Sequence, residues 1–177
     1  MYSFKQNQIV KVDTVHSSLV CGLVLANKPT RVLELGMGGG ETTDAILHAL
    51  DFNTTPYKYT LVDSWYDWNG VKPDGVDELY SAKINVVTST EKDFVFSCKE
   101  TFQFIMSDAD HQHTNEWFEY VYENLLESSG ILIYHDVNLI ENAYPNLVEI
   151  YEKVKNKGIS HKLFNKSSIP GERCHRG

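Results

Sequence analysis

The chain has 177 residues, of which 42% are hydrophobic, 12% aromatic and 23% charged. This composition excludes disordered and fibrous proteins, and the length suits one hydrophobic core but not two, so we expect a single domain over residues 1–177. The formal net charge is −8, with 9 basic against 23 acidic residues up to residue 152 and 7 against 1 beyond it, and an acidic body of this size disfavours nucleic-acid binding.

Apolar runs typical of buried strands alternate along the chain with stretches of helical spacing. In chain order the pattern predicts a helix over residues 15–24, a strand over 31–35, a helix over 42–50, strands over 59–62, 84–88 and 102–106, a helix over 117–125 opened by Thr114, a strand over 131–134, a helix over 147–154 and a weaker strand-like run over 159–164.

Strands that are apolar on both faces and separated by helices indicate a parallel sheet covered on both sides. We therefore predict a doubly wound, mostly parallel α/β fold of the Rossmann-like type. In such sheets a ligand binds beyond the carboxyl ends of the strands, where the strand order reverses. Residues that directly follow a strand are the first candidates for function.

A glycine-rich loop follows the first predicted strand. Gly36, Gly38 and Gly40 lead into the next helix, and Glu41 stands where a dinucleotide-binding G-x-G-x-x-G motif has its last glycine. Glycine permits positive φ and lets a ligand approach the backbone. The alternative is a tight strand–helix turn without a ligand.

Two acids flank this loop. Glu34 lies inside the end of the first strand, and Asp63 closes the second, where it can accept hydrogen bonds from a ribose. Carboxylates here disfavour an anionic pyrophosphate and favour a cationic ligand. A nicotinamide oxidoreductase is accordingly a weak alternative.

The pattern E-x-G-x-G-x-G, followed by an acid that closes the second strand, resembles class I S-adenosylmethionine-dependent methyltransferases. The resemblance implies the cofactor S-adenosylmethionine. It assigns the methionine part to Glu34, Gly36, Gly38 and Gly40, the ribose to Asp63, and the adenine to Trp65 and Ser89. For Trp65 the alternative is a half-buried loop aromatic that packs without touching a ligand.

Acids and histidines follow the fourth and fifth predicted strands. Asp108 and Asp136 should meet at the mouth of the sheet and form a site for a hard cation such as Mg²⁺, with Mn²⁺ and Fe²⁺ as alternatives. Both acids could instead cap the helices that follow, which is the interpretation we prefer for Asp110. His113 is expected to begin a helix, and no context predicts a role for the other histidines, His16, His48, His161 and His175.

The D-x-D-H sequence at residues 108–111 and the pair His135-Asp136 narrow the resemblance to bacterial cephalosporin-hydroxylase-like proteins and metal-dependent catechol-type O-methyltransferases. The resemblance implies that Asp108, Asp136 and His135 hold a metal, and that His111 is the catalytic base beside Asp108. Val137 departs from the catechol type, which has Asn there.

The end of the chain departs from this family as well. A hairpin of two further strands normally completes the family's sheet, whereas this sequence ends at residues 171–177, where the last strand would begin. We expect a short or missing last strand, or an edge completed by a partner, so a homo-oligomer is a candidate state.

The function that these patterns predict is S-adenosylmethionine-dependent, metal-assisted O-methylation of a small molecule. The acceptor would lie between residues 138–145 and an aromatic loop of Trp65, Tyr66, Trp68 and Tyr80. The alternatives are a metal-dependent hydroxylase-like enzyme on the same fold and a non-catalytic S-adenosylmethionine-binding module.

The cellular location follows from weaker signals. Cys21, Cys98 and Cys174 form no C-x-x-C motif, which fits a reducing compartment. The polar N-terminus lacks a signal-peptide core, and the apolar run over 19–26 is shorter than half of a ~20-residue membrane span. We expect a soluble, cytoplasmic protein that does not bind membranes.

Overall fold

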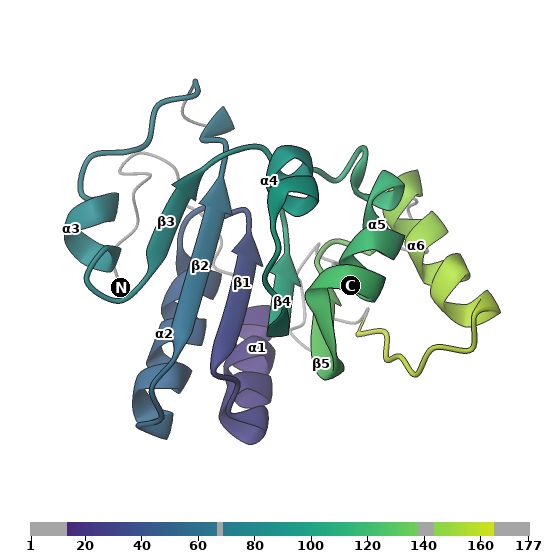
Figure 1. Ribbon diagram of the computed structural model, residues 1–177, viewed down its shortest axis with the longest axis horizontal. Coiled ribbons are helices and arrows are strands. Elements are labelled where there is room, and N and C mark those ends of the chain that lie inside the picture. The colour runs from purple at the N-terminus through teal and green to yellow at the C-terminus, as the bar shows by residue number, and fades with distance from the viewer. Residues whose placement is uncertain (1–13, 67–68, 138–143, 165–177) are drawn as a thin grey trace.

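A computed structural model describes residues 14–66, 69–137 and 144–164 of the chain (Figure 1). Its centre is a five-stranded parallel sheet of order β3-β2-β1-β4-β5. The strands are β1 (Arg31–Leu35), β2 (Lys58–Asp63), β3 (Asn85–Thr88), β4 (Phe102–Ser107) and β5 (Leu126–Tyr134). The predicted Rossmann-like sheet is confirmed, and its order reverses between β1 and β4.

Helices cover both faces of this sheet, as Figure 1 shows. Apolar residues of α1 (Thr14–Asn27), α2 (Glu41–Asn53) and α3 (Val76–Tyr80) pack on one face. On the other face lie α4 (Glu91–Ser97) and the segment 114–125, and α6 (Pro145–Asn156) packs against the outer side of that segment. No described helix has the length and apolar character that crossing a membrane requires.

The segment 114–125 forms the predicted helix with a changing pitch. It begins as a 3₁₀ turn, η2 (Thr114–Glu116), continues as α5 (Phe118–Tyr120) and ends as a single π-helical stretch, η3 (Val121–Leu125). Neighbouring positions of this segment serve two cores: Trp117 and Val121 pack against the sheet, and Phe118 packs against α6. Both cores fix the chain between β4 and β5.

Four elements differ from the sequence expectation. The short helices α3 and α4 were not predicted. Thr90 caps α4, because its hydroxyl accepts a hydrogen bond from the Asp93 N–H. β5 begins at Leu126, earlier than expected, with an irregular register opposite residues 102–104. The strand predicted over residues 159–164 was wrong: these residues are neither strand nor helix, and Ile159 and Leu163 pack beside α6.

Within the described residues, β5 forms one edge of the sheet, with no strand on its outer side. A cavity of about 910 Å³ runs beside it, lined by residues of α1, β5 and α6 and by 159–164. The predicted short last strand concerns residues 165–177, which lie outside the described part of the chain.

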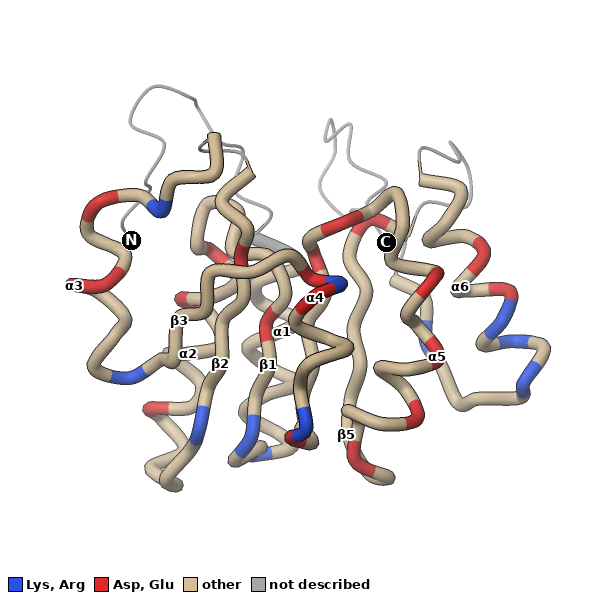
Figure 2. Tube along the Cα trace, turned by 45° about the horizontal axis from the view of Figure 1, so that its top comes forward, with Lys and Arg blue, Asp and Glu red and all other residues tan. Residues whose placement is uncertain are grey.

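Charge is separated along the strands, as Figure 2 shows. Arg31 and Lys58 begin β1 and β2 and form ion pairs with Glu127 and Glu100 at that end of the sheet. Acidic residues gather instead where the strands end. The carboxyl end of the sheet is therefore the electronegative end, which suits a cationic ligand or a metal ion.

Candidate active site

The first part of the site is the loop after β1. The Gly36 N–H donates to the Val62 carbonyl at 2.8 Å, and the Asp108 N–H donates to the Leu35 carbonyl at 2.8 Å. Gly36 has φ +88°, and a Cβ there would lie 2.4 Å from the Asp108 carbonyl oxygen. Only glycine fits at this close contact between the residues that follow β1 and β4.

The next glycines open the loop outward. Gly38 has φ +54°, and a Cβ there would meet no atom within 4 Å. Gly40, with φ +89°, precedes α2, whose first turn carries the acids Glu41 and Asp44. Carboxylates occupy the helix end where a pyrophosphate would bind. The loop thus leaves room for a ligand without the electrostatics of a phosphate site.

Asp63 ties this loop to the second strand. Its Oδ2 accepts a hydrogen bond from the Met37 N–H at 2.8 Å, and its Oδ1 accepts one from the Trp65 N–H at 2.6 Å. Its carbonyl accepts a hydrogen bond from the Ser89 N–H at 3.1 Å. Asp63 therefore connects the loops after β1, β2 and β3, and its oxygens retain lone pairs for a ribose.

Glu34 lies beneath the glycine loop with 0% of its surface exposed. Its Oε2 accepts hydrogen bonds from the hydroxyls of Thr43, at 2.9 Å, and Tyr59. Its Oε1 is buried and has no hydrogen-bond partner among the described residues. Burial raises the pKa of this carboxyl to about 8, although the two hydroxyl donors oppose the shift. The unpartnered oxygen means that hydrogen bonds compensate the burial of this carboxyl group only in part.

The predicted adenine contacts lie in different environments. The Trp65 side chain is 0% exposed and belongs to the core, where its Nε1–H donates to the Thr88 hydroxyl at 2.9 Å. The side chain is thus more deeply buried than the half-buried loop aromatic that was the alternative. Ser89 is half-buried directly after β3. Contact of either residue with adenine stays a prediction.

The aromatic loop expected to wall the acceptor is divided. Tyr80 is buried, and its hydroxyl donates to Asp44 at 2.7 Å, whereas Tyr66 is 86% exposed. Trp68 lies outside the described residues, as do residues 138–143 of the other expected wall. Tyr144 is described, and its ring lies 4.6 Å from that of His111.

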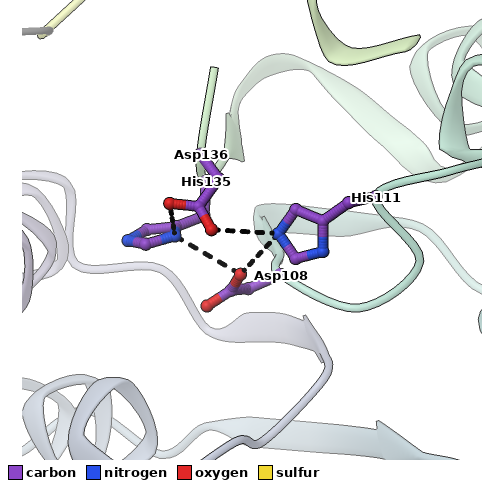
Figure 3. A group of neighbouring side chains, drawn as sticks. All are labelled: Asp108, His111, His135 and Asp136. Carbon is purple, nitrogen blue, oxygen red and sulfur yellow. Dashed lines mark ion pairs between the residues drawn. The ribbon is translucent and has the colours of Figure 1, made fainter. Parts of the chain in front are cut away.

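The second part of the site is a group of four side chains beyond β4 and β5, drawn in Figure 3. Asp108 and His111 follow β4, while His135 and Asp136 follow β5, and one ligand atom from each lies within 4.8 Å of the others. The backbone N–H of His135 donates a hydrogen bond to the Ser107 carbonyl, which extends the pairing of β4 and β5. The structure brings together the predicted metal residues and the predicted base. We refer to these four residues as the Asp–His cluster.

The imidazole nitrogens face carboxylate oxygens inside the cluster. His111 Nε2 lies 3.1 Å from Asp108 Oδ1 and 3.4 Å from Asp136 Oδ2. His135 Nδ1 lies 3.3 Å from Asp108 Oδ1 and 3.1 Å from Asp136 Oδ1. Both nitrogens are buried without a hydrogen bond of regular geometry. Nitrogen and oxygen atoms that converge without aligned hydrogen bonds fit ligands of a metal ion.

The same charges shift the pKa values within the cluster. Burial would lower the pKa of His111 and His135, but the carboxylates of Asp108 and Asp136 outweigh it and raise both to about 10. Burial works against ionisation of Asp108, yet the two imidazoles hold its pKa below the usual value. The cluster on its own therefore retains protons, which a bound cation would displace.

Three contacts of this region were not predicted. Glu91 on α4 is buried, and its carboxylate accepts hydrogen bonds from the Ser107 hydroxyl at 3.0 Å and the Asp110 N–H at 3.2 Å. His16 on α1 lies against His135, with 2.7 Å between His16 Nδ1 and His135 Nε2. No local pattern signals these contacts, because the partners are far apart in the sequence.

Asp110 behaves as expected. Its Oδ1 accepts hydrogen bonds from the N–H groups of Gln112 and His113, at 3.0 and 3.2 Å, so it caps the turn before η2. His113 precedes η2, and its Nδ1 lies 3.1 Å from Asp110 Oδ2. Neither residue belongs to the Asp–His cluster.

Comparison with known families now identifies the chain. A model of a methyltransferase domain matches residues 33–137, more than half of the sequence. The chain belongs to this methyltransferase domain family. The matched segment begins in β1 and ends directly after the Asp–His cluster, so it contains the glycine loop, Asp63 and all four cluster residues. No curated protein matches the sequence.

Solved structures show the same fold for the domain. An O-methyltransferase from Bacillus cereus in complex with S-adenosylhomocysteine has a TM-score of 0.68 and 19% identity, over 84% of this chain and 72% of the other. The O-methyltransferase TomG from Streptomyces achromogenes, in complex with S-adenosylmethionine, has a TM-score of 0.64 and 13% identity, over 82% of this chain and 70% of the other. The S-adenosylhomocysteine-bound methyltransferase PaMTH1 from Podospora anserina has a TM-score of 0.63 and 13% identity, over 80% of this chain and 69% of the other. The domain has the class I methyltransferase fold.

Proposed function

We propose that the domain transfers a methyl group from S-adenosylmethionine to an oxygen atom of a small molecule, with help from a divalent metal ion. The observation that supports this most is the adjacency of a ligand loop and a donor cluster at one point of the sheet. Gly36 of the loop packs against the backbone of Asp108 of the cluster, where the strand order reverses. Two reactants held on either side of this point would be close enough to react.

The loop side would hold S-adenosylmethionine, which supplies a methyl group on a positively charged sulfur. The opening at Gly38 gives it access to the backbone, and Asp63 accepts hydrogen bonds from its ribose. Glu34, buried beneath this loop, would favour the cationic part of the cofactor electrostatically when ionised, without direct contact. We place the adenine near Ser89, beyond β3. The solved relatives that bind this molecule or its product support the assignment.

The cluster side would hold the metal ion through Asp108, Asp136 and His135. A bound divalent ion lowers the pKa of a hydroxyl group that approaches it. Asp108 and Asp136 supply negative charge, and His135 supplies a nitrogen. An acceptor with two adjacent oxygens suits such a site, because both oxygens can face the same cation.

His111 would take the proton from the acceptor. Its Nδ1 lies 3.0 Å from the Ala109 carbonyl, which can only accept a hydrogen bond, so the neutral ring carries its proton on Nδ1 and leaves Nε2 free to act as a base. The pKa of His111 is raised by Asp108 and Asp136. A cation between these carboxylates opposes that shift and favours the unprotonated base.

The acceptor has room beside the cluster. His16 and His135 line the cavity of about 910 Å³ together with apolar residues such as Ile131, Ile133 and Val137. Mainly apolar walls with some polar groups are typical of small-molecule sites. We place the carbon skeleton of the acceptor in the part of this cavity next to His135.

A second candidate is a metal-dependent hydroxylase. The observation in its favour is the presence of two imidazoles beside two carboxylates, since two histidines and one carboxylate bind Fe²⁺ in many oxygenases. The glycine loop and the methyltransferase family favour methyl transfer. Mass spectrometry of the product separates the two reactions, because one adds a methyl group and the other an oxygen atom.

The test is an assay with S-adenosylmethionine labelled in its methyl group and a panel of acceptors that carry adjacent hydroxyls, with and without a chelator. We expect label in the acceptor and a loss of transfer on chelation that added metal restores. His111→Gln should lower kcat while S-adenosylhomocysteine still binds. A rate of methyl transfer that changes neither with the chelator nor with the His111 substitution would contradict the proposed chemistry.

A further inference from the structure

A histidine outside the Asp–His cluster contacts one inside it. His16 lies on α1, on the other side of His135 from the two carboxylates, with 2.7 Å between His16 Nδ1 and His135 Nε2. The two rings are perpendicular, with centroids 4.6 Å apart. At this distance one nitrogen must donate a proton and the other must accept it.

The position of that proton decides what His135 can bind. His135 is only 9% exposed, and its Nδ1 lies between carboxylate oxygens of Asp108 and Asp136. A neutral imidazole has one N–H. If Nε2 carries it and donates to His16 Nδ1, then His135 Nδ1 presents a lone pair to the cluster, as a metal ligand must.

We propose that His16 is a positioning residue that holds His135 as a nitrogen ligand and thereby shifts the preference of the site from Mg²⁺ toward transition ions such as Co²⁺ and Fe²⁺. This inference rests on the proposed metal site. Mg²⁺ prefers oxygen ligands and retains several waters, whereas imidazole favours later first-row ions. The ion preference therefore depends on whether His135 Nδ1 is unprotonated and directs its lone pair into the Asp–His cluster.

Two substitutions of similar size separate this role from simple packing. In His16→Asn, the side-chain oxygen can still accept a hydrogen bond from His135 Nε2–H; in His16→Leu, no acceptor remains. We expect His16→Leu to lower the ratio of Co²⁺ to Mg²⁺ affinity about 10-fold, as loss of an outer partner commonly does, and His16→Asn to keep the wild-type ratio. His48→Leu, at an exposed position of α2, is the control.

The measurement is titration of the metal-free full chain with Co²⁺ and Mg²⁺ separately, with the visible absorption of bound Co²⁺ as a second readout. His135→Asp should itself lower the ratio, and adding His16→Leu to it should have no further effect, because the acceptor then has nothing to orient. Thermal melts of each variant show that it is folded.

The outcomes separate this inference from the proposed function. If the wild type binds neither ion, the metal site itself is wrong, and this inference falls with it. If the wild type binds both ions but His16→Leu keeps the wild-type ratio and Co²⁺ spectrum, the metal site stands and the role of His16 is overturned. Equal losses in His16→Leu and His16→Asn would also overturn it, because packing alone would then explain them.

Discussion

The two halves of the site are built by different means. At the ends of β1 and β2, backbone geometry does most of the work: Gly36 fits under the Asp108 carbonyl, and Asp63 binds two backbone N–H groups. At the ends of β4 and β5, four side chains converge with like and unlike charges in close contact. The first half is held mainly by backbone contacts. In the second half the carboxylates raise the pKa of both imidazoles, so the cluster holds protons that a bound cation would replace.

This difference should appear first in folding stability. Gly36→Ala places a Cβ against the Asp108 backbone at φ +88°, so we expect a loss of about 3 kcal/mol or more in the free energy of unfolding. Gly38→Ala has the same kind of backbone strain but open space around it, and should cost about 1 kcal/mol. Urea denaturation measures the free energy of unfolding of both variants. Equal losses would show that the close contact of Gly36 with the Asp108 backbone is wrong.

The second prediction concerns the cluster half alone. Asp108→Asn removes a charge that faces both imidazoles, and we expect the affinity for a divalent ion to fall at least about 100-fold. Binding of S-adenosylhomocysteine should survive, because Asp108 touches the glycine loop through its backbone only. Titration calorimetry with each ligand checks this, and retention of full metal affinity would exclude Asp108 as a ligand.

The third prediction is the counterpart in the loop half. Asp63→Ala removes the ribose acceptor and the hydrogen bond to Met37, so we expect the affinity for S-adenosylhomocysteine to fall about 10- to 100-fold. Metal affinity, titrated in the same sample, should not change. A loss of metal binding that matches the loss of S-adenosylhomocysteine binding would show that the two halves are not separable.

The last prediction is a pH dependence from Glu34, which appears as a slope with pH rather than as a loss at one pH. Its pKa is about 8 in the folded protein and near 4.5 when unfolded, so between these values the folded state binds more protons. The stability contributed by protonated Glu34 is therefore present at low pH and lost as pH rises toward 8, with a slope of at most about 1.4 kcal/mol per pH unit. The stability difference between wild type and Glu34→Gln should fall over this range; a difference independent of pH would contradict the raised pKa.

The sequence predicted what local patterns determine. Five strands, the glycine loop, Asp63 and the meeting of Asp108 with Asp136 followed from periodicity, glycine spacing and the geometry of parallel sheets. Helices α3 and α4 were missed because five and seven residues carry too little periodicity. The beginning of β5 was missed because Glu127, Ser128 and Ser129 are polar. No pattern in one segment could have predicted the contact of His16 with His135, 119 positions away.

The most direct test of the central claim is titration of S-adenosylhomocysteine into the metal-free wild-type chain by calorimetry, with NAD as the control. The account predicts one molecule bound per chain, binding that survives a chelator, and no binding of NAD, because carboxylates rather than phosphate-binding groups surround the glycine loop. A folded chain that binds NAD in its place, or that binds neither molecule, would contradict the claim.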